Sequence, residues 1–359
     1  MTRHYSIALI PGDGIGVDVI MEGRKVLNAL SELDGGIKLD YTEFDWSCEY
    51  YLKNGKMMPE KGLDTLKSFD SIYLGAVGYP GVPDHISLWG LLLPIRREFQ
   101  QYINLRPVKL LRGIQSPLAK RTAADLNFTV IRENNEGEYS NIGGRMYEGT
   151  EMDMAIQSSV FTRHGVERVL RYAFELASVQ GGRKRLTAAT KSNGINHTMP
   201  FWDDYVRKIN SEFPDITTEI IHIDALAAFF VTKPNTFDVV VASNLFGDIL
   251  TDLGAAIVGG LGIAPSANIN PEKRFPSMFE PVHGSAPDIA GKGIANPTAA
   301  IWCAAMMLEH LGEYSLAEVL MESLQQVLEE AKVLTPDLGG TAFTWQIGDE
   351  VCRKIRAGV

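Results

Sequence analysis

The stretch SIALIPGDGIGVDVI at residues 6–20 decides between two fold classes, because an apolar run breaks here into a glycine-rich turn. A strand, a glycine turn and a helix N-terminus together favour a nucleotide-binding βα unit. The dinucleotide fingerprint GxGxxG would place its third glycine at position 17, where this chain has Val17. The spacing from Gly12 is GxGxG, so the stretch is not a Rossmann fingerprint. It indicates either another kind of cofactor contact or a tight structural turn.

Short apolar runs alternate with amphipathic segments along the rest of the chain. The runs predict strands buried on both faces at 6–10, 71–76, 127–131, 185–189, 219–223 and 237–242. Helical periodicity predicts helices at 16–33, 163–179, 200–211, 244–258, 297–311, 315–333 and 343–356. This alternation predicts an α/β fold with a largely parallel sheet. Because no Pro/Ser-rich linker is present, we expect a second domain to be an insertion through the sheet.

Composition excludes several classes of protein. The 359 residues carry a formal net charge of −10, which argues against a nucleic-acid partner or an anionic membrane surface. Cys48, Cys303 and Cys352 are too few and too scattered for a disulfide framework or a zinc site. The uncharged stretch 253–271 is interrupted by glycine and proline, which disfavours a membrane span, and no signal-peptide pattern is present. We therefore expect a cytoplasmic protein.

Two carboxylates lie four residues apart in ASNLFGDILTDLGAAIVGGLG at 242–262. A helix would place Asp248 and Asp252 on one face, where their like charges repel. A hard cation such as Mg²⁺ or Mn²⁺ would relieve that repulsion, which would make the pair a metal site. Alternatively, the two acids bind nothing and are stabilised by the dipole at the start of the helix. A third acid, Asp224, ends the strand-like EIIHID, where α/β sites usually gather ligands.

Arginines and two further polar residues are candidates for the rest of a site. Arg96 and Arg106 flank a stretch that we expect to be helical, and Arg132 follows the strand NFTVI. Arginine binds planar carboxylates through two parallel N–H groups. Tyr139 and Lys191 each come just beyond a predicted strand, and a lysine there can serve as acid or base. Each of these residues taken alone is also consistent with a solvated surface side chain.

The irregular run FEPVHGSAPDIAGKGIANP at 279–297 combines glycines, prolines and short polar residues. Such a run is normally a mobile surface loop. Its length and composition instead favour a loop wrapped around an adenosine group, with His283, Asp288 and Asn296 available to bind it.

Together and in this order, these segments resemble the β-decarboxylating dehydrogenases of (R)-hydroxyacids, the family of isocitrate, 3-isopropylmalate, homoisocitrate and tartrate/D-malate dehydrogenases. The motifs that carry the resemblance span nearly the whole chain: IPGDGIG, NLRP, VIRENNEGEYS, TKSN, NLFGDILTDL and EPVHGSAPDIAGKGIANP. The resemblance implies the non-Rossmann isocitrate/isopropylmalate dehydrogenase-like fold, with a large mixed, mostly parallel sheet and two domains around a central cleft. Residues 1–106 plus 263–359 would form the cofactor-side domain. Residues 107–262 would form an inserted domain with metal and substrate residues and the dimer interface.

The resemblance also implies a role for each group of candidate residues. The substrate would contact Arg96, Arg106, Arg132, Trp89 and Leu92. The metal, Mg²⁺ or Mn²⁺, would bind to Asp224, Asp248 and Asp252. The catalytic residues would be Tyr139, Lys191 and Asp224. The cofactor would contact Ile10, Gly12, Gly14, His283, Gly284, Ser285, Ala286, Asp288, Ile289 and Asn296. In the implied homodimer, Lys191 and Asp224 would reach the site from the partner subunit, and a monovalent cation such as K⁺ is a further candidate cofactor.

Two short segments indicate which cofactor and which substrate the implied reaction uses. Asp288 lies where the resembled NAD enzymes hold the ribose, and a carboxylate there would repel the 2′-phosphate of NADP, which favours NAD. SLWGLLLPIRR at 87–97 offers no polar group for a third carboxylate, and Trp89 would fill the space of an isopropyl group. The segment looks like that of tartrate/D-malate dehydrogenases. If Trp89 instead points into the core, 3-isopropylmalate is again a candidate substrate.

The expected reaction is therefore NAD-dependent oxidation of small (R)-2-hydroxy dicarboxylic acids, with decarboxylation depending on the substrate. D-malate would give pyruvate and CO₂, and tartrate would give oxaloglycolate. The hypothesis from a different class is a non-catalytic nucleotide- or RNA-binding protein on the same scaffold. The presence of Lys191, Tyr139 and all three acids favours the enzyme.

Overall fold

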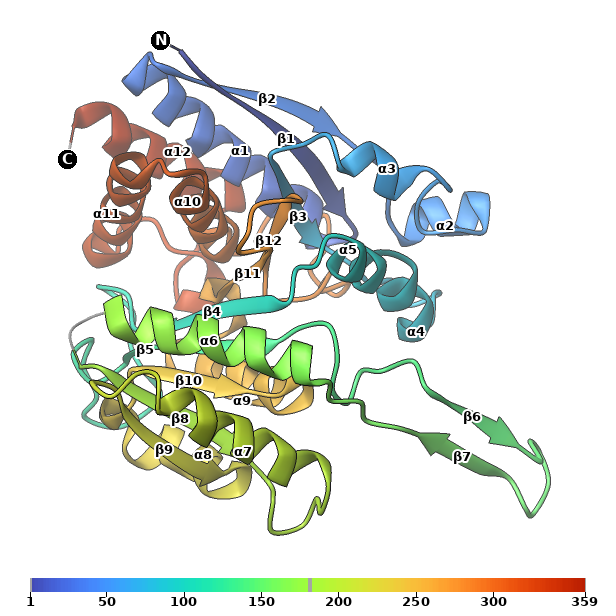
Figure 1. Cartoon of the computed structure of the whole chain (residues 1–359). Coiled ribbons are helices and arrows are strands. Elements are labelled where there is room, and N and C mark those ends of the chain that lie inside the picture. The colour runs from blue at the N-terminus through green and yellow to red at the C-terminus, as the bar shows by residue number, and fades with distance from the viewer. Residues whose placement is uncertain (1, 180–182, 359) are drawn as a thin grey trace.

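The computed structural model describes residues 2–179 and 183–358, and a large twisted sheet runs through the molecule (Figure 1). Its strands are β1 (Arg3–Gly12), β2 (Ile37–Glu43), β3 (Ser71–Ala76), β4 (Ile103–Lys109), β5 (Asn127–Glu133), β8 (Arg185–Thr190), β9 (Thr217–His222), β10 (Val239–Ala242), β11 (Pro265–Ile269) and β12 (Ser277–Pro281). Their order in the sheet is β2-β1-β3-β12-β11-β4-β5-β10-β8-β9. Neighbouring strands are parallel except at β12–β11, β11–β4 and β4–β5. The expected α/β class with a mixed, mostly parallel sheet is thus confirmed.

Helices pack against the sheet along its whole width. They are α1 (Ile15–Asp34), α2 (Cys48–Asn54), α3 (Gly62–Leu66), α4 (Asp84–Ser87), α5 (Leu93–Glu98), α6 (Arg163–Val179), α7 (Thr198–Asn210), α8 (Ile223–Thr232), α9 (Asn244–Ile257), α10 (Thr298–Leu311), α11 (Tyr314–Glu330) and α12 (Thr344–Ala357). In Figure 1, α1 and α10–α12 lie with β1–β3, whereas α6–α9 lie around β5, β8, β9 and β10. Every helix and strand predicted from periodicity is present, with ends shifted by a few residues.

One predicted element is wrong. The stretch between Arg96 and Arg106 was expected to be helical, but α5 ends at Glu98 and β4 begins at Ile103. Gln100 has a φ of 48°, a left-handed conformation that a helix cannot continue through. β4 then pairs with β11 and β5, so the segment is a central strand of the sheet.

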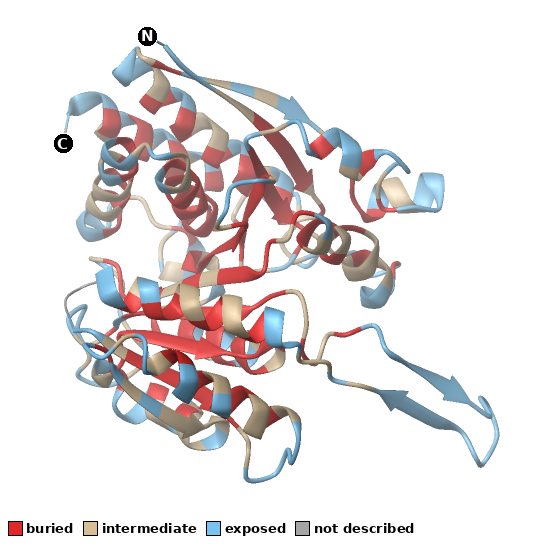
Figure 2. Ribbon diagram, viewed as in Figure 1, coloured by how far each residue is buried: buried red, intermediate tan, exposed pale blue. Residues whose placement is uncertain are grey.

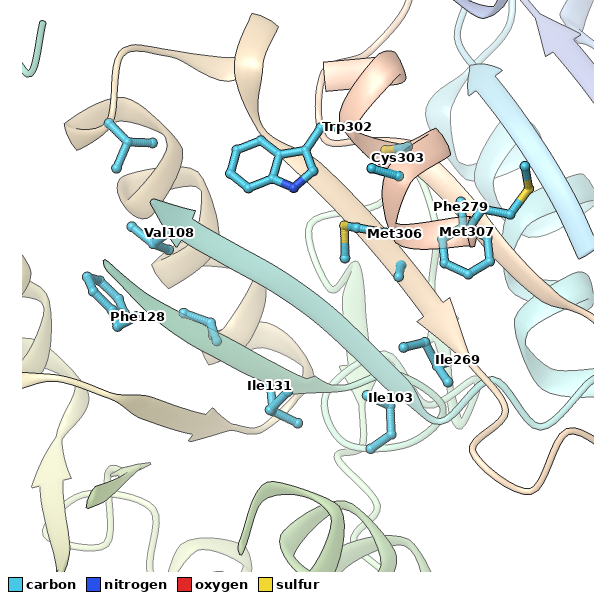
Figure 3. Packing of buried hydrophobic residues seen from close by; sticks show 14 of the residues in the cluster. Ile103, Val108, Phe128, Ile131, Ile269, Phe279, Trp302, Cys303, Met306 and Met307 are labelled. Atoms are coloured by element: carbon cyan, nitrogen blue, oxygen red, sulfur yellow. The ribbon is translucent and has the colours of Figure 1, made fainter. Parts of the chain in front are cut away.

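The largest apolar cluster extends along the sheet from α1 to α9, and α10 is the helix most fully buried in it. Residues 298–308 of α10 are all buried, because this helix packs on β11 and β12 and is covered by α1 and α11. A helix that is apolar all round is normally an interior one. Figure 2 shows this burial, and Figure 3 shows Cys303, Met306 and Met307 of α10 near Phe279 of β12. This packing fixes the sheet that carries the candidate site.

The sheet contains two blocks of parallel strands. β2, β1, β3 and β12 form one parallel block, and β5, β10, β8 and β9 form the other, with β11 and β4 between them. The expected boundary at residue 106 falls inside β4, which pairs with strands on both sides. The division into domains stays a prediction.

A two-stranded hairpin projects from the body of the molecule (Figure 1). It consists of β6 (Gly143–Met146) and β7 (Met154–Gln157), and every residue of both strands is exposed (Figure 2). We call residues 142–157 the arm. Its exposed apolar side chains are Ile142, Met146, Tyr147, Met152, Met154 and Ile156. An isolated hairpin is marginally stable in water, and contiguous exposed apolar surface is typical of an interaction site.

In the described part of the chain, no helix is both long and apolar enough to cross a membrane. The sulfhydryl groups of Cys48, Cys303 and Cys352 are free and buried.

Candidate functional site

The opening glycine turn joins β1 to two other segments of the chain. Gly12 has a φ of 74°, and a Cβ there would lie 1.9 Å from the main-chain oxygen of Ala76 at the end of β3. Gly14 has a φ of 55°, and a Cβ there would lie 2.1 Å from the main-chain oxygen of Ser285. The N–H of Ile15 donates to that same oxygen at 2.9 Å. Glycine is therefore required at both positions, and the turn lies directly against the 283–296 loop.

A cavity of about 420 Å³, which we call the loop cavity, lies behind this turn. It is lined by Ile15, Leu261, Gly262, His283, Gly284, Ala286, Ile289, Ile294, Asn296, Pro336 and Asp337. Burial lowers the pKa of His283, and its buried Nε2 atom has no hydrogen-bond partner in the structure. The Asn296 Nδ2 donates to Asp337 Oδ2 at 2.9 Å. Mostly apolar walls with a few polar groups are typical of a small-molecule site.

The remaining residues expected to contact a cofactor lie outside this lining. Asp288 is exposed on the loop between Ala286 and Ile289. The Ile10 side chain is 0% exposed and packs in the core of the β1–β3 block, so the structure does not bring it to the cavity.

A smaller cavity of about 160 Å³ lies beside Leu92, Arg96 and Arg106, and we call it the arginine cavity. Leu92 and Arg96 come from a helical segment that contains a π-helical turn at Leu88–Leu92. Pro94 has no N–H and its ring crowds the carbonyl four residues back, which disfavours regular α-helical bonding. The Leu93 N–H instead bonds to Leu88, five residues back.

The side chains of the segment SLWGLLLPIRR therefore point to different parts of the protein. Leu91 and Leu93 are buried in the protein, and Leu92 lines the arginine cavity. Trp89 is half-buried and belongs to neither the core clusters nor this lining, and the Arg97 guanidinium lies 4.7 Å from its ring centre. The alternative in which Trp89 points into the core is therefore not what the structure shows.

The three predicted arginines are buried and come together. Each has a polar partner: Arg96 Nη2 donates to Glu280 Oε1 at 2.7 Å, Arg106 Nη1 to Thr251 Oγ1 at 2.5 Å, and Arg132 Nη2 to Asn244 Oδ1 at 2.7 Å. Burial, reinforced by the positive charges of Arg132 and Arg96, lowers the pKa of Arg106 to about 10. Arg96 and Arg106 line the arginine cavity, and Arg132 is close enough for its charge to act on Arg106, so the positive charge gathers beside a cavity suited to an anionic ligand.

The two predicted metal-binding aspartates lie one turn apart on α9, as expected. Asp248 Oδ1 is ion-paired with Arg132 Nη1, and Arg106 Nη1 lies 3.6 Å from Asp252 Oδ1. Burial raises the pKa of Asp248, but Arg132 and Arg106 outweigh it and hold that pKa below its ordinary value. Burial raises the pKa of Asp252, and Arg106 opposes this only in part. The Tyr139 hydroxyl donates to Asp248 Oδ2 at 2.8 Å, and burial raises the pKa of Tyr139.

Lys191 and Asp224 form a separate pair. Lys191 follows β8 directly, and its Nζ lies 2.9 Å from Asp224 Oδ1. Asp224 does not end a strand as expected: β9 ends at His222, and Asp224 lies in the first turn of α8, where the helix dipole favours an acid. The hydrogen bond from Lys191 lowers the pKa of Asp224. Among residues 2–179 and 183–358, no three acidic, histidine or cysteine side chains gather closely enough for a metal ion.

Several residues at the site were missed by the sequence reasoning. Asn244 and Glu280 belong to the two most specific motifs, NLFGDILTDL and EPVHG, so motif membership could have found them. Asp13 is buried within PGDGIG and accepts hydrogen bonds from the N–H groups of Cys48 and Gly78, each at 3.0 Å. Asp337 reaches the loop cavity from a distant turn and carries no local signal.

Comparisons with known proteins agree with this architecture. The family model for isocitrate/isopropylmalate dehydrogenase matches residues 6–351. The chain is 54% identical over 355 residues to the probable tartrate dehydrogenase/decarboxylase of Bacillus subtilis (strain 168), and the match covers 99% of each chain. It is also 54% identical over 362 residues to the D-malate dehydrogenase (decarboxylating) of Escherichia coli (strain K12), again covering 99% of each.

Among solved structures, the isocitrate dehydrogenase of Methylococcus capsulatus superposes with a TM-score of 0.88 at 35% identity, covering 98% of this chain and 99% of that one. The expected fold and the likeness to tartrate and D-malate dehydrogenases are thereby confirmed. The chain is an oxidoreductase, and it belongs to the isocitrate/isopropylmalate dehydrogenase family.

Proposed function

We propose that this enzyme uses NAD and a divalent metal to oxidise small (R)-2-hydroxy dicarboxylic acids. D-malate would be converted to pyruvate and CO₂, and tartrate to oxaloglycolate. The observation that carries the proposal is the group of three buried arginines beside Tyr139 and two aspartates. Relatives that are 54% identical and named for these two activities support it.

The arginine cavity favours a small dicarboxylate. Arg96 and Arg106 line it, Arg132 lies near Arg106, and such buried guanidinium groups bind carboxylates through paired N–H donors. Leu92 is apolar and provides no partner for a third carboxylate. The volume of about 160 Å³ suits a substrate whose third carbon carries only hydrogen or hydroxyl.

The aspartates of α9 fit a divalent metal. They supply carboxylate oxygens, which Mg²⁺ and Mn²⁺ prefer, and the Asp252 side chain is 61% exposed and free to accept a further charge. We infer that Asp224 of a second copy completes the set. When bound, the metal would polarise the substrate hydroxyl and stabilise the enolate that follows loss of CO₂.

The protein's own residues move the protons. Lys191 would take the proton of the C2 hydroxyl, through a water held near Asp224. Tyr139 keeps its proton because its pKa is raised, and it would deliver that proton to the enol carbon after CO₂ has left. The buried arginines would hold both substrate carboxylates until one of them leaves as CO₂, at positions where water screens little of the attraction.

The loop cavity fits the adenosine end of NAD. It is large enough for a flat base, and the unpartnered Nε2 of His283 is available to a ligand. Asp288 is exposed on the same loop. Its carboxylate would accept hydrogen bonds from the ribose hydroxyls of NAD and would repel the 2′-phosphate of NADP. The nicotinamide would accept the hydride from C2.

A homodimer would join the two parts of the site. Within the described part of one chain, Asp224 does not gather with Asp248 and Asp252 into a possible metal site. The arm exposes a row of apolar side chains, a surface that a second copy would bury.

Initial rates with D-malate, (+)-tartrate, meso-tartrate and 3-isopropylmalate, each with NAD and Mn²⁺, test the proposal. We expect the largest kcat/KM with D-malate or a tartrate, and trapping of CO₂ with D-malate. The largest value with 3-isopropylmalate would overturn the substrate assignment. NAD binding without turnover of any substrate would favour the non-catalytic protein.

A further inference from the structure

Arg97 lies next to Arg96 on α5 but serves a different part of the molecule. Successive side chains on a helix diverge by about 100°, so the two guanidinium groups point apart. Arg96 pairs with Glu280 of β12. Arg97 instead donates from Nη2 to the main-chain oxygen of Tyr139 at 2.8 Å. It therefore connects α5 to the loop that carries the proposed acid.

Trp89 supports the Arg97 guanidinium from the other side. The Arg97 Cζ atom lies 4.7 Å from the centre of the Trp89 ring, within the range of a cation–π contact. Burial lowers the pKa of Arg97, and the negative charge of Glu133 opposes this. A planar guanidinium stacked on a ring has its N–H groups held in one plane, which directs Nη2 at its acceptor.

The loop around Tyr139 is held by α9, by α5 and by residues 157–160. On the α9 side, the Glu138 carboxylate accepts the Ser243 hydroxyl at 2.8 Å and the Leu245 N–H at 3.0 Å. On the α5 side, Arg97 holds the Tyr139 main chain. The Tyr139 hydroxyl itself reaches Asp248 at 2.8 Å. Gly137 and Ser140, on either side of Tyr139, are also bonded to Val160 and Gln157, whereas Arg97 is the contact that ties the Tyr139 main-chain oxygen itself to α5.

We propose that Arg97 is a positioning residue for Tyr139, and that Trp89 is the platform that orients Arg97. The proposal rests on the proposed function, in which Tyr139 donates its proton to the enol carbon after CO₂ has left. Arg97 should therefore matter for the conversion of D-malate to pyruvate. It should matter little for the oxidation of tartrate to oxaloglycolate, which needs no proton from Tyr139.

The test is Arg97→Gln, compared with Glu98→Gln as the matched control on the same helix. Glu98 is exposed and its carboxylate pairs with Lys67 at 2.9 Å, away from Tyr139. We expect Arg97→Gln to lower kcat for pyruvate formation about tenfold, a fraction of the roughly 10²–10⁴-fold that a general acid supplies. Its kcat for tartrate oxidation should stay within about twofold of wild type. Trp89→Leu should shift the same ratio by a smaller factor.

A double-variant comparison separates positioning from a general structural effect. In a Tyr139→Phe background, Arg97→Gln should cause no further loss of pyruvate formation, because it acts through Tyr139. An equal loss in both backgrounds, or an equal loss on both substrates, would overturn the proposal.

Amide hydrogen exchange supplies a readout that needs no turnover. Arg97→Gln should speed exchange in residues 134–141, whereas Glu98→Gln should not. If the wild type turns over neither substrate, the proposed function fails, and the exchange result still decides the role of Arg97. Unchanged exchange in that loop would contradict it.

Discussion

The candidate site has two parts with opposite environments. Arg106 and Arg132 are buried beside Asp248, and their charges change one another's pKa values. Lys191 and Asp224 form an ion pair whose side chains are 31% and 67% exposed. A pair so open to water contributes little to stability, whereas buried charges act strongly on a bound ligand. The comparison shows that the exposed pair gains a catalytic environment only if something covers it.

The largest effect is expected at the exposed pair. Lys191→Ala should lower NADH production from D-malate by roughly 10²–10⁴-fold, because it removes the proposed base. The thermal midpoint of the dissociated chain should barely move, since the lost ion pair is solvated in one chain. Lys208→Ala is the matched control, because Lys208 is also an exposed lysine paired with an acid, Glu167, at 2.7 Å. Full activity in Lys191→Ala would refute the assigned role.

Substrate binding should depend on the two hydrogen bonds that hold the Arg132 guanidinium in place. Arg132 donates to Asn244 from both Nε and Nη2, and a lysine cannot reproduce these two bonds. We expect Arg132→Lys to lower kcat/KM about 100-fold, a loss typical of a misplaced substrate. Arg171→Lys provides the comparison, because Arg171 makes a two-pronged contact to Glu212 at the surface. Similar kinetics for the two variants would mean that the buried position has no special role.

The buried part of the site should make the free energy of unfolding depend on pH through Glu133. Burial raises the pKa of Glu133, the neighbour of Arg132, to about 7 from 4.5. Because the folded state holds this proton more tightly, its stabilising contribution is complete below pH 4.5 and is lost as pH rises to 7. The loss amounts to ~3 kcal/mol. Urea unfolding between pH 4 and 8 should show it in wild type and not in Glu133→Gln. Parallel pH profiles would contradict this account.

The smallest effect concerns folding stability at the exposed pair. In one chain the Asp224 side chain is 67% exposed, so Asp224→Asn should leave the thermal midpoint of the dissociated, metal-free chain unchanged at both low and high salt. Calorimetry at the two salt concentrations measures this directly. A clear drop in the midpoint at low salt would show that the pair is structural.

The sequence predicted most of the periodic elements because their burial follows a regular pattern. It failed at β4, where INLRPVK follows a helix after only four residues and Gln100 breaks that helix through its backbone conformation. No sequence pattern reports a single positive φ at a glutamine. Pairing with distant β11 then determines the strand.

For the site, motifs indicated which residue types gather but not which contacts they make. Arg132 and Asp248 were both expected, yet their ion pair depends on α9 lying beside β5. Arg97 was not singled out, because its partner is a main-chain oxygen more than forty residues away. Any residue type can provide a main-chain acceptor, so such a contact cannot be predicted from the amino-acid sequence.

The central claim is that one site takes Tyr139 from one chain and Lys191 from another. Its most direct test is a mixed dimer purified from co-expressed Tyr139→Phe and Lys191→Ala chains that carry different affinity tags. Each parent variant alone should be nearly inactive with D-malate. The mixed dimer has one site with both residues intact, so it should recover about half of the wild-type activity per dimer. Activity no higher than that of the parents would place both residues in the same chain's site and contradict the account.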